Sequence, residues 1–224
     1  MVAEKDERLR VELPTGAVTV SAAYGRPAGA WATVVVAHGA GSTYAHPFLL
    51  GFTRALRDAG VATMRISFPY AEAGRRMPGP PAHAMVTLTA AMRAASSFGA
   101  GEPLWAGGRS YGGRMASMAA AAGVIEPAGL VYLGYPLHPP GRPDQLRDAH
   151  LPSVVAPQLF ISGRADPFVD PHSQLLDAVA SCPDATLQWV DGGHSFEVKG
   201  RPRAQDAIGA YLAPLVVDFM RARF

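Results

Sequence analysis

The hydrophobic residues of this chain change their spacing repeatedly, from the short runs typical of strands to the three- and four-residue spacing typical of helices. Two partly alternating runs, residues 9–14 and 17–25, flank a Pro-Thr-Gly turn and predict a hairpin. The run ATVVVAH at 32–38 is continuous and β-branched, which indicates a strand buried on both faces. Apolar positions then recur at helical spacing and predict a helix over 46–60.

This alternation of strands and helices continues to the end of the chain. Further strands are expected at 61–68, 103–108, 129–136, 157–163 and 186–193. Further helices are expected at 83–99, 110–123, 171–182 and 203–224. Pro214 falls within the last helix and is expected to kink or interrupt it. The pattern predicts one α/β domain over residues 1–224, with a mostly parallel sheet of about eight strands and helices on both faces.

Sheets of this kind bind ligands beyond the carboxyl ends of their strands, so catalytic residues are expected directly after strands. Ser110 meets this expectation within the pattern Gly108-Arg109-Ser110-Tyr111-Gly112, between a predicted strand and a predicted helix. Glycines two residues to either side allow a sharp turn that exposes the serine hydroxyl at its apex. The alternative interpretation is a glycine-rich helix start capped by serine.

A serine hydroxyl becomes nucleophilic when a base removes its proton and a third group orients that base. Asp166 follows one predicted strand, in ISGRADPF, and His194 follows the last one, in VDGGHSF. The order serine, acid, histidine is one of those found in known triads. We therefore predict Ser110, Asp166 and His194 as catalytic residues. Asp191 is a second candidate for the acid, although its position before two glycines also fits the end of a strand.

Acyl transfer also needs hydrogen-bond donors for the oxyanion that forms on the carbonyl oxygen. The glycine-rich loop HGAGS at 38–42 follows the buried strand and allows close backbone approach. We predict the backbone amides of Tyr111 and Ala40 as these donors, with Gly41 as the alternative to Ala40. A phosphate-binding loop is a weaker interpretation of HGAGS, because the Lys-Ser/Thr pair of such loops does not follow.

Composition and charge narrow the class of protein. The chain has 224 residues, a net charge of +2 and no block of like charges, so neither nucleic acid nor membrane is expected as a partner. Cys182, the single cysteine, fits a reducing compartment, and the charged start of the chain lacks the apolar run of a secretory signal. We expect a cytoplasmic protein that needs no metal and no organic cofactor; its oligomeric state stays open.

Together with the blocks FPY…GRR and LGYPLHPPGRP, these motifs resemble the α/β-hydrolase superfamily over essentially the whole chain. Within it the chain is most similar to small, lidless hydrolases related to dienelactone hydrolase. The resemblance implies the α/β-hydrolase fold, and the segment between the sixth and seventh strands is too short, at about twenty residues, for a lid domain. Dienelactone hydrolase proper has a cysteine where this chain has Ser110, and an arginine where it has Val198.

These features predict a hydrolase of carboxylic esters or thioesters with small or polar acyl groups. The same triad also serves acyltransferases and peptidases, and a non-catalytic interaction protein of this fold is a further alternative. Candidate substrate-binding residues are His38, Tyr70, Arg75, Arg76, His138 and Phe168, with Tyr111 and Pro136 as further wall residues. His46 and His83 are expected at helix starts, His150 in a loop and His172 at the surface. Arg75 and Arg76 fit either an anionic substrate group or a solvated loop.

Overall fold

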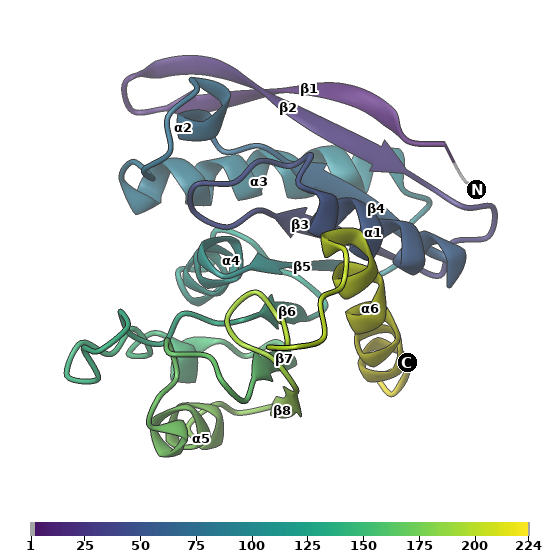
Figure 1. Cartoon of the computed structure of the whole chain (residues 1–224). Coiled ribbons are helices and arrows are strands. Elements are labelled where there is room, and N and C mark those ends of the chain that lie inside the picture. The colour runs from purple at the N-terminus through teal and green to yellow at the C-terminus, as the bar shows by residue number, and fades with distance from the viewer. Residues whose placement is uncertain (1–2, 224) are drawn as a thin grey trace.

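A computed structural model describes residues 3–223, in which the strands form one eight-stranded sheet in the order β1-β2-β4-β3-β5-β6-β7-β8 (Figure 1). The strands are β1 Lys5–Leu13, β2 Gly16–Gly25, β3 Ala32–Ala37, β4 Val61–Ile66, β5 Leu104–Arg109, β6 Leu130–Leu133, β7 Gln158–Gly163 and β8 Ala185–Val190. The hairpin β1–β2 is antiparallel and β2 pairs antiparallel with β4, whereas β3 to β8 run parallel. The mostly parallel sheet expected from the hydrophobic pattern is confirmed.

Helices cover both faces of this sheet. They are α1 Pro47–Asp58, α2 Pro69–Glu72, α3 Pro81–Phe98, α4 Tyr111–Ala121, α5 His172–Ala180 and α6 Gln205–Arg221, with a 3₁₀ turn η1 at Leu151–Ser153. Successive residues of β3 face opposite layers. Val35 packs in a core with residues of α3, α4 and α5, and Val36 packs in a second core with residues of α1 and α6. The continuous apolar run of this strand is thus explained by burial on both sides.

Two features of the helices differ from the sequence prediction. Pro214 does not interrupt the last helix, which is continuous over Gln205–Arg221. Packing explains this: α6 lies beside α1 (Figure 1), and a Cβ at Gly209 would collide with the backbone of Phe48. Buried contacts of this kind outweigh the one backbone hydrogen bond that a proline removes. The short helix α2 was not predicted; it begins at Pro69, a residue type favoured at the first helical position.

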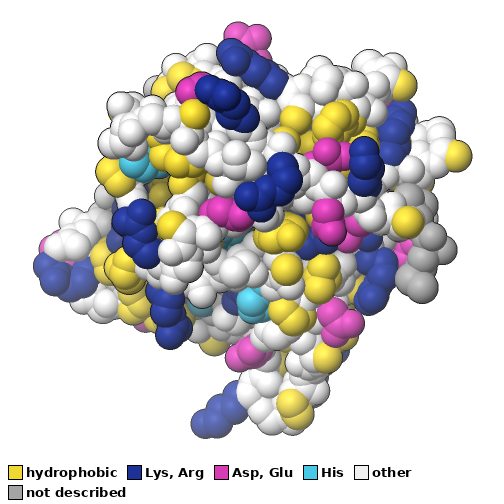
Figure 2. Space-filling view, turned by 90° about the horizontal axis from the view of Figure 1, so that it is seen from above, with side chains coloured by type: hydrophobic (Ala, Val, Ile, Leu, Met, Phe, Trp, Pro, Cys, Tyr) yellow, Lys and Arg dark blue, Asp and Glu magenta, His cyan; other side chains and the backbone are white. Residues whose placement is uncertain are grey.

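The segment between β6 and β7 contains only the turn η1, so the expected absence of a lid domain is confirmed. None of the described helices combines the length and apolar character that crossing a bilayer requires. Figure 2 shows basic and acidic side chains interspersed over one face. The ion pairs of the molecule include Arg8–Glu72, between β1 and α2, and Arg10–Glu12, within β1.

Candidate active site

The turn between β5 and α4 holds Ser110 at the start of the helix, with φ 48° and ψ −113°. A positive φ is uncommon for a residue with a side chain and indicates local strain. The flanking glycines make the turn possible, because a Cβ at Gly108 or Gly112 would collide with the backbone of Ala37 on β3. The G-x-S-x-G segment is therefore a tight elbow that carries the serine hydroxyl into a cleft.

Three side chains form a hydrogen-bonded row at this elbow. Nε2 of His194 lies 2.8 Å from Oγ of Ser110, and Nδ1 of the same ring lies 2.8 Å from Oδ2 of Asp166. Because a carboxylate only accepts, Nδ1–H is the donor to Asp166, which leaves Nε2 as the acceptor for the serine hydroxyl. The row has the proton arrangement that a general base needs.

Burial and packing hold the other two residues of this row, His194 and Asp166, in place. The Asp166 side chain is fully buried, and its Oδ1 accepts a hydrogen bond of 2.9 Å from the amide of Phe168. The Phe168 ring stacks on the His194 ring with 4.0 Å between centroids and an interplanar angle of 27°. The alternative acid, Asp191, is exposed and lines a separate hollow beside Val198. The structure thus joins Asp166, not Asp191, to the histidine.

The glycine-rich loop after β3 forms the facing wall, close to the serine. A Cβ at Gly39 would lie 3.6 Å from Cβ of Ser110. Tyr70 holds this loop from behind: its hydroxyl donates to the Gly39 carbonyl at 3.3 Å and accepts from the Gly41 amide. In the described chain, the amides of Ala40 and Tyr111 donate to no other backbone or side-chain group. This leaves Ala40, rather than Gly41, with an amide available for a ligand.

His38 anchors the same loop from the protein interior. Its ring is fully buried, and Nε2 accepts from the Phe68 amide at 3.1 Å, so Nδ1–H donates to the Gly39 carbonyl at 2.8 Å. Burial lowers the pKa of His38 to about 4, so the ring is neutral near pH 7. Both polar atoms of the ring are used inside the protein, and His38 does not reach the cleft.

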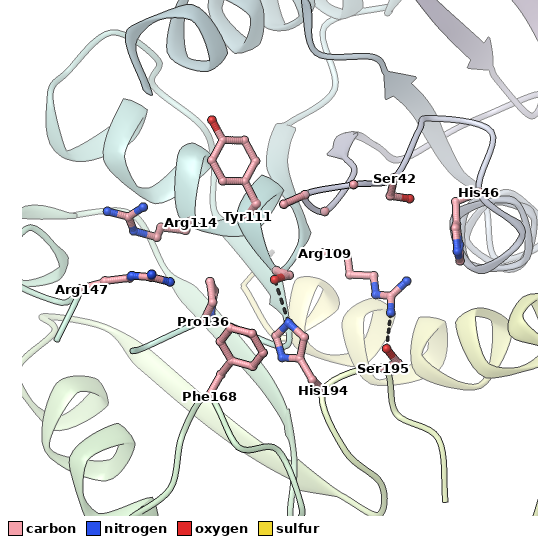
Figure 3. Close-up of a pocket in the computed structure, with 14 residues that line it drawn as sticks. Ser42, His46, Arg109, Tyr111, Arg114, Pro136, Arg147, Phe168, His194 and Ser195 are labelled. Atoms are coloured by element: carbon pink, nitrogen blue, oxygen red, sulfur yellow. Dashed lines mark hydrogen bonds between the residues drawn. The ribbon is translucent and has the colours of Figure 1, made fainter. Parts of the chain in front are cut away.

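The cleft around Ser110 has a volume of about 520 Å³ (Figure 3). It is lined by Gly39, Ala40, Gly41, Ser42, His46, Arg109, Ser110, Tyr111, Arg114, Pro136, Arg147, Phe168, His194 and Ser195. Its lining contains three arginines and no acidic residue. Within the described chain, no three histidine, cysteine, aspartate or glutamate side chains gather as a metal ion would require.

A comparison with known protein families identifies one that matches most of the chain. The family described as alpha/beta hydrolase domain matches residues 30–219. The chain belongs to the α/β-hydrolase family. The resemblance stated from the sequence motifs is thereby confirmed.

Solved structures of other α/β hydrolases share this fold. Dienelactone hydrolase from Anabaena variabilis has 23% sequence identity and a TM-score of 0.74, with 98% of each chain covered. An α/β serine hydrolase without a lid from Xanthomonas campestris has 21% identity and a TM-score of 0.72, covering 97% of this chain and 94% of that one. A cold-adapted esterase from an Arctic intertidal metagenomic library has 18% identity and a TM-score of 0.69, covering 100% and 96%.

Some of the predicted substrate-binding residues of this α/β hydrolase line the cleft, and others do not. Phe168, Tyr111 and Pro136 line the cleft. His138 is fully buried, with Nδ1 bonded to the Pro139 carbonyl at 2.8 Å, and does not line it. Neither do His38 and Tyr70, which support the loop after β3, nor Arg75 and Arg76, which are exposed on the loop after α2.

The remaining histidines of this α/β hydrolase lie mostly where the pattern places them. His46 caps α1 by accepting from the Phe48 amide at 3.2 Å, and it also lines the cleft, which was not predicted. His83 lies in the first turn of α3, and His172 begins α5, where its partly buried ring lies 4.4 Å from that of Trp189. His150 is half-buried and hydrogen-bonded to Ser117 at 2.7 Å.

The sequence analysis did not predict the three arginines of the cleft as substrate contacts. Arg114 follows Ser110 by four residues, which is one helical turn, so its position on the same helix face was available from spacing. Arg109 is held beside the histidine loop, where its guanidinium donates to Oγ of Ser195 at 2.6 Å. Arg147 lies in the irregular segment between β6 and β7, where no periodicity indicates which way a side chain points.

Proposed function

We propose that this α/β hydrolase is a serine hydrolase that cleaves carboxylic esters or thioesters of small or polar acyl groups through an acyl-enzyme. One observation carries the proposal: the row from Ser110 through His194 to the buried Asp166, with both contacts at 2.8 Å. A strained elbow and two available amides beside the hydroxyl complete the set of groups that acyl transfer uses.

In the first half-reaction, Oγ of Ser110 attacks the carbonyl carbon of the ester while its proton moves to Nε2 of His194. The carboxylate of Asp166 stabilises the new imidazolium. The amides of Ala40 and Tyr111 donate to the oxyanion of the tetrahedral intermediate, together with the positive end of α4. When the C–O or C–S bond to the leaving group breaks, His194 returns the proton to that group.

In the second half-reaction, a water molecule replaces the leaving group. His194 removes a proton from the water as the hydroxide oxygen attacks the acyl carbon, and the bond to Oγ of Ser110 then breaks. The proton returns to the serine and the free acid leaves. The fixed stacking of Phe168 against His194 keeps the imidazole in position for both halves of the cycle.

The expected substrate size rests on the shape of the cleft. The segment between β6 and β7 contributes only Pro136 and Arg147 to the cleft walls, and no lid domain covers the site. A long acyl chain needs a deep apolar groove, whereas this cleft mixes polar and charged walls with a few aromatic ones. We therefore propose short or polar acyl groups.

Labelling with a fluorophosphonate probe tests the proposed nucleophile, because such probes phosphonylate an activated serine with loss of fluoride. We expect the wild-type chain to be labelled and the Ser110→Ala variant to lose labelling. Ser96→Ala, which changes an exposed serine on α3, is the matched control and should be labelled like the wild type. Absence of labelling on folded wild-type protein would instead favour the non-catalytic alternative.

A further inference from the structure

Two arginine side chains meet at one end of the cleft. Arg114 comes from α4, one helical turn after Ser110, and Arg147 comes from the segment between β6 and β7. Figure 3 shows their guanidinium groups side by side, on the side of Pro136 away from His194. Burial lowers the pKa of Arg147. The like charge of the nearby Arg114 lowers it further.

Neither guanidinium forms an ion pair with a carboxylate of the described chain. In the part of the chain that the structure describes, eight other arginines do pair with a carboxylate. Nε of Arg114 is buried without a hydrogen-bond partner. Two adjacent unpaired cations in a half-buried place cost free energy, which an anion between them would recover.

The backbone around Arg147 is fixed, so the pair does not depend on a loose loop. The Arg147 amide donates to the Leu137 carbonyl at 2.8 Å, and the Arg147 carbonyl accepts from the Tyr135 hydroxyl at 2.8 Å. The amide and the carbonyl of Arg147 are thus both held by residues that follow β6, and only the side chain is left to move.

A second contact ties the same segment to α4. The Ser117 hydroxyl donates to the Arg114 carbonyl at 2.7 Å, so Nε2–H of His150 is the donor in the 2.7 Å contact with that hydroxyl. His150 therefore joins the segment that carries Arg147 to the helix that carries Arg114. This connection ties the backbone near Arg147 to the backbone near Arg114.

The third arginine of the cleft has a different environment. In Figure 3, Arg109 lies on the opposite side of His194 from Arg114 and Arg147. Its guanidinium stacks on the Phe48 ring at 4.9 Å and donates to Ser195. These contacts use Arg109 to hold the loop of His194. The free positive charge is thus concentrated at the Arg114–Arg147 end.

We propose that Arg114 and Arg147 bind a carboxylate or phosphate group of the substrate, so that the enzyme prefers esters that carry a negative charge a few bonds from the scissile carbonyl. The inference rests on the proposed function, because it assigns one end of the same cleft. Guanidinium groups suit such ligands, since their planar N–H pairs match two oxygens of either anion. The short distance follows from the chain, because Arg114 comes four residues after the nucleophile, about 6 Å along the helix axis.

The first test measures binding, in a protein that cannot turn the ligand over. Calorimetric titration of the Ser110→Ala variant compares monomethyl adipate and methyl phosphate with the neutral dimethyl adipate. We expect at least one anion to bind about tenfold or more tightly than the neutral diester, and its affinity to fall with added salt. The two anions distinguish a carboxylate site from a phosphate site.

Substitutions then locate the site. Adding Arg147→Gln or, separately, Arg114→Gln to the Ser110→Ala protein should remove about tenfold of the anion affinity. Arg142→Gln, which changes an exposed arginine of the same segment paired with Asp144, is the matched control and should leave the affinity intact. Anions that bind no more tightly than the diester, or anion binding that neither cleft substitution weakens, would overturn the proposal.

Turnover by the wild type separates this proposal from the proposed function. Mono-4-nitrophenyl adipate carries its charge in the acyl half and 4-acetoxybenzoate carries it in the leaving group, and each is compared with its neutral methyl ester. A higher kcat/KM for either anionic member, reduced toward the neutral value by Arg147→Gln, supports the anion site and shows which half it holds. Equal hydrolysis of charged and neutral esters overturns the anion site alone, whereas no hydrolysis of any ester counts against the hydrolase.

Discussion

At the scale of single residues, the geometry of the site depends on backbone positions, and these positions in turn determine where the reacting groups lie. Ser110 has a positive φ that an ordinary residue avoids, and Gly108 and Gly112 remove the side chains that would prevent it. Behind the loop that follows β3, His38 and Tyr70 form hydrogen bonds with the backbone groups of that loop that point into the protein. The two glycines, His38 and Tyr70 touch no substrate atom in the proposed mechanism, yet they decide where the hydroxyl and the free amides lie.

The choice between the two candidate acids gives a prediction at this scale. Asp166→Asn should lower kcat/KM for a neutral aryl ester by about 10³–10⁴-fold, because an amide cannot stabilise the imidazolium or hold the productive tautomer of His194. Asp191→Asn, which changes the exposed alternative, should stay within about twofold of the wild type. Steady-state kinetics with both variants decide the matter; a large loss in Asp191→Asn with little loss in Asp166→Asn would reverse the assignment.

Whether a residue can be predicted to line the site depends on the kind of segment that carries it. Ser110, Asp166 and His194 each lie within four residues of the end of a strand. The rule that the carboxyl ends of parallel strands share one edge brings them together without knowledge of coordinates. The path of an irregular segment obeys no such rule. For that reason Arg147 was missed, and Arg75 and Arg76 were proposed for a cleft that they do not reach.

At the scale of elements, most strands and helices followed from hydrophobic spacing, because each face of the sheet is covered and the burial pattern is strong. One of the two exceptions is the last helix. Pro214 argued locally against a continuous last helix, but Ile208, Leu212 and Val216 are buried along its inner side and hold it together. Local propensity is a weak term beside packing of this extent.

The crossing of α1 and α6 gives a prediction about stability. Gly209→Ala should lower the unfolding free energy by about 2 kcal/mol, because the added methyl group meets the backbone of Phe48 and forces the helices apart. For a domain of this size the Tm should fall by roughly 5 °C. Gly79→Ala is the matched control, since a Cβ there makes only an ordinary contact of 3.8 Å with the His83 ring. Thermal unfolding followed by circular dichroism tests both; equal Tm values for the two variants would contradict the close crossing.

At the scale of the whole molecule, strand order explains why three distant segments meet. β5, β7 and β8 lie within four neighbouring positions of the sheet, and all three run parallel. The turns after them therefore emerge at one edge, where they carry the serine, the acid and the histidine. The loop after β3, next to β5 on its other side, supplies the facing wall.

Buried neutral histidines give the molecule a pH dependence of stability that is separate from its chemistry. Burial lowers the pKa of His38 from 6.5 to about 4, and burial together with the charge of Arg114 lowers that of His150 to about 4. The unfolded chain binds these protons at its ordinary pKa, so falling pH favours unfolding. The stability that depends on the neutral rings is complete above pH 6.5 and is lost as the pH falls toward 4. For the fully buried His38 the loss amounts to about 3 kcal/mol by pH 4.

Urea unfolding between pH 7.5 and 4.5 measures this loss of unfolding free energy. Protonation of carboxylates adds its own loss mainly below this range. Glu102 is partly buried, but hydrogen bonds from Thr33 and the Ala100 amide lower its pKa to about 2, so its contribution is lost only below its ordinary value of 4.5. In the wild type we expect the unfolding free energy to fall steadily across the window. His150→Gln should be less stable at pH 7.5, because the bond to Ser117 changes, yet its stability should fall less steeply with pH. A variant with the same slope as the wild type would show that this ring takes up a proton without unfolding the protein.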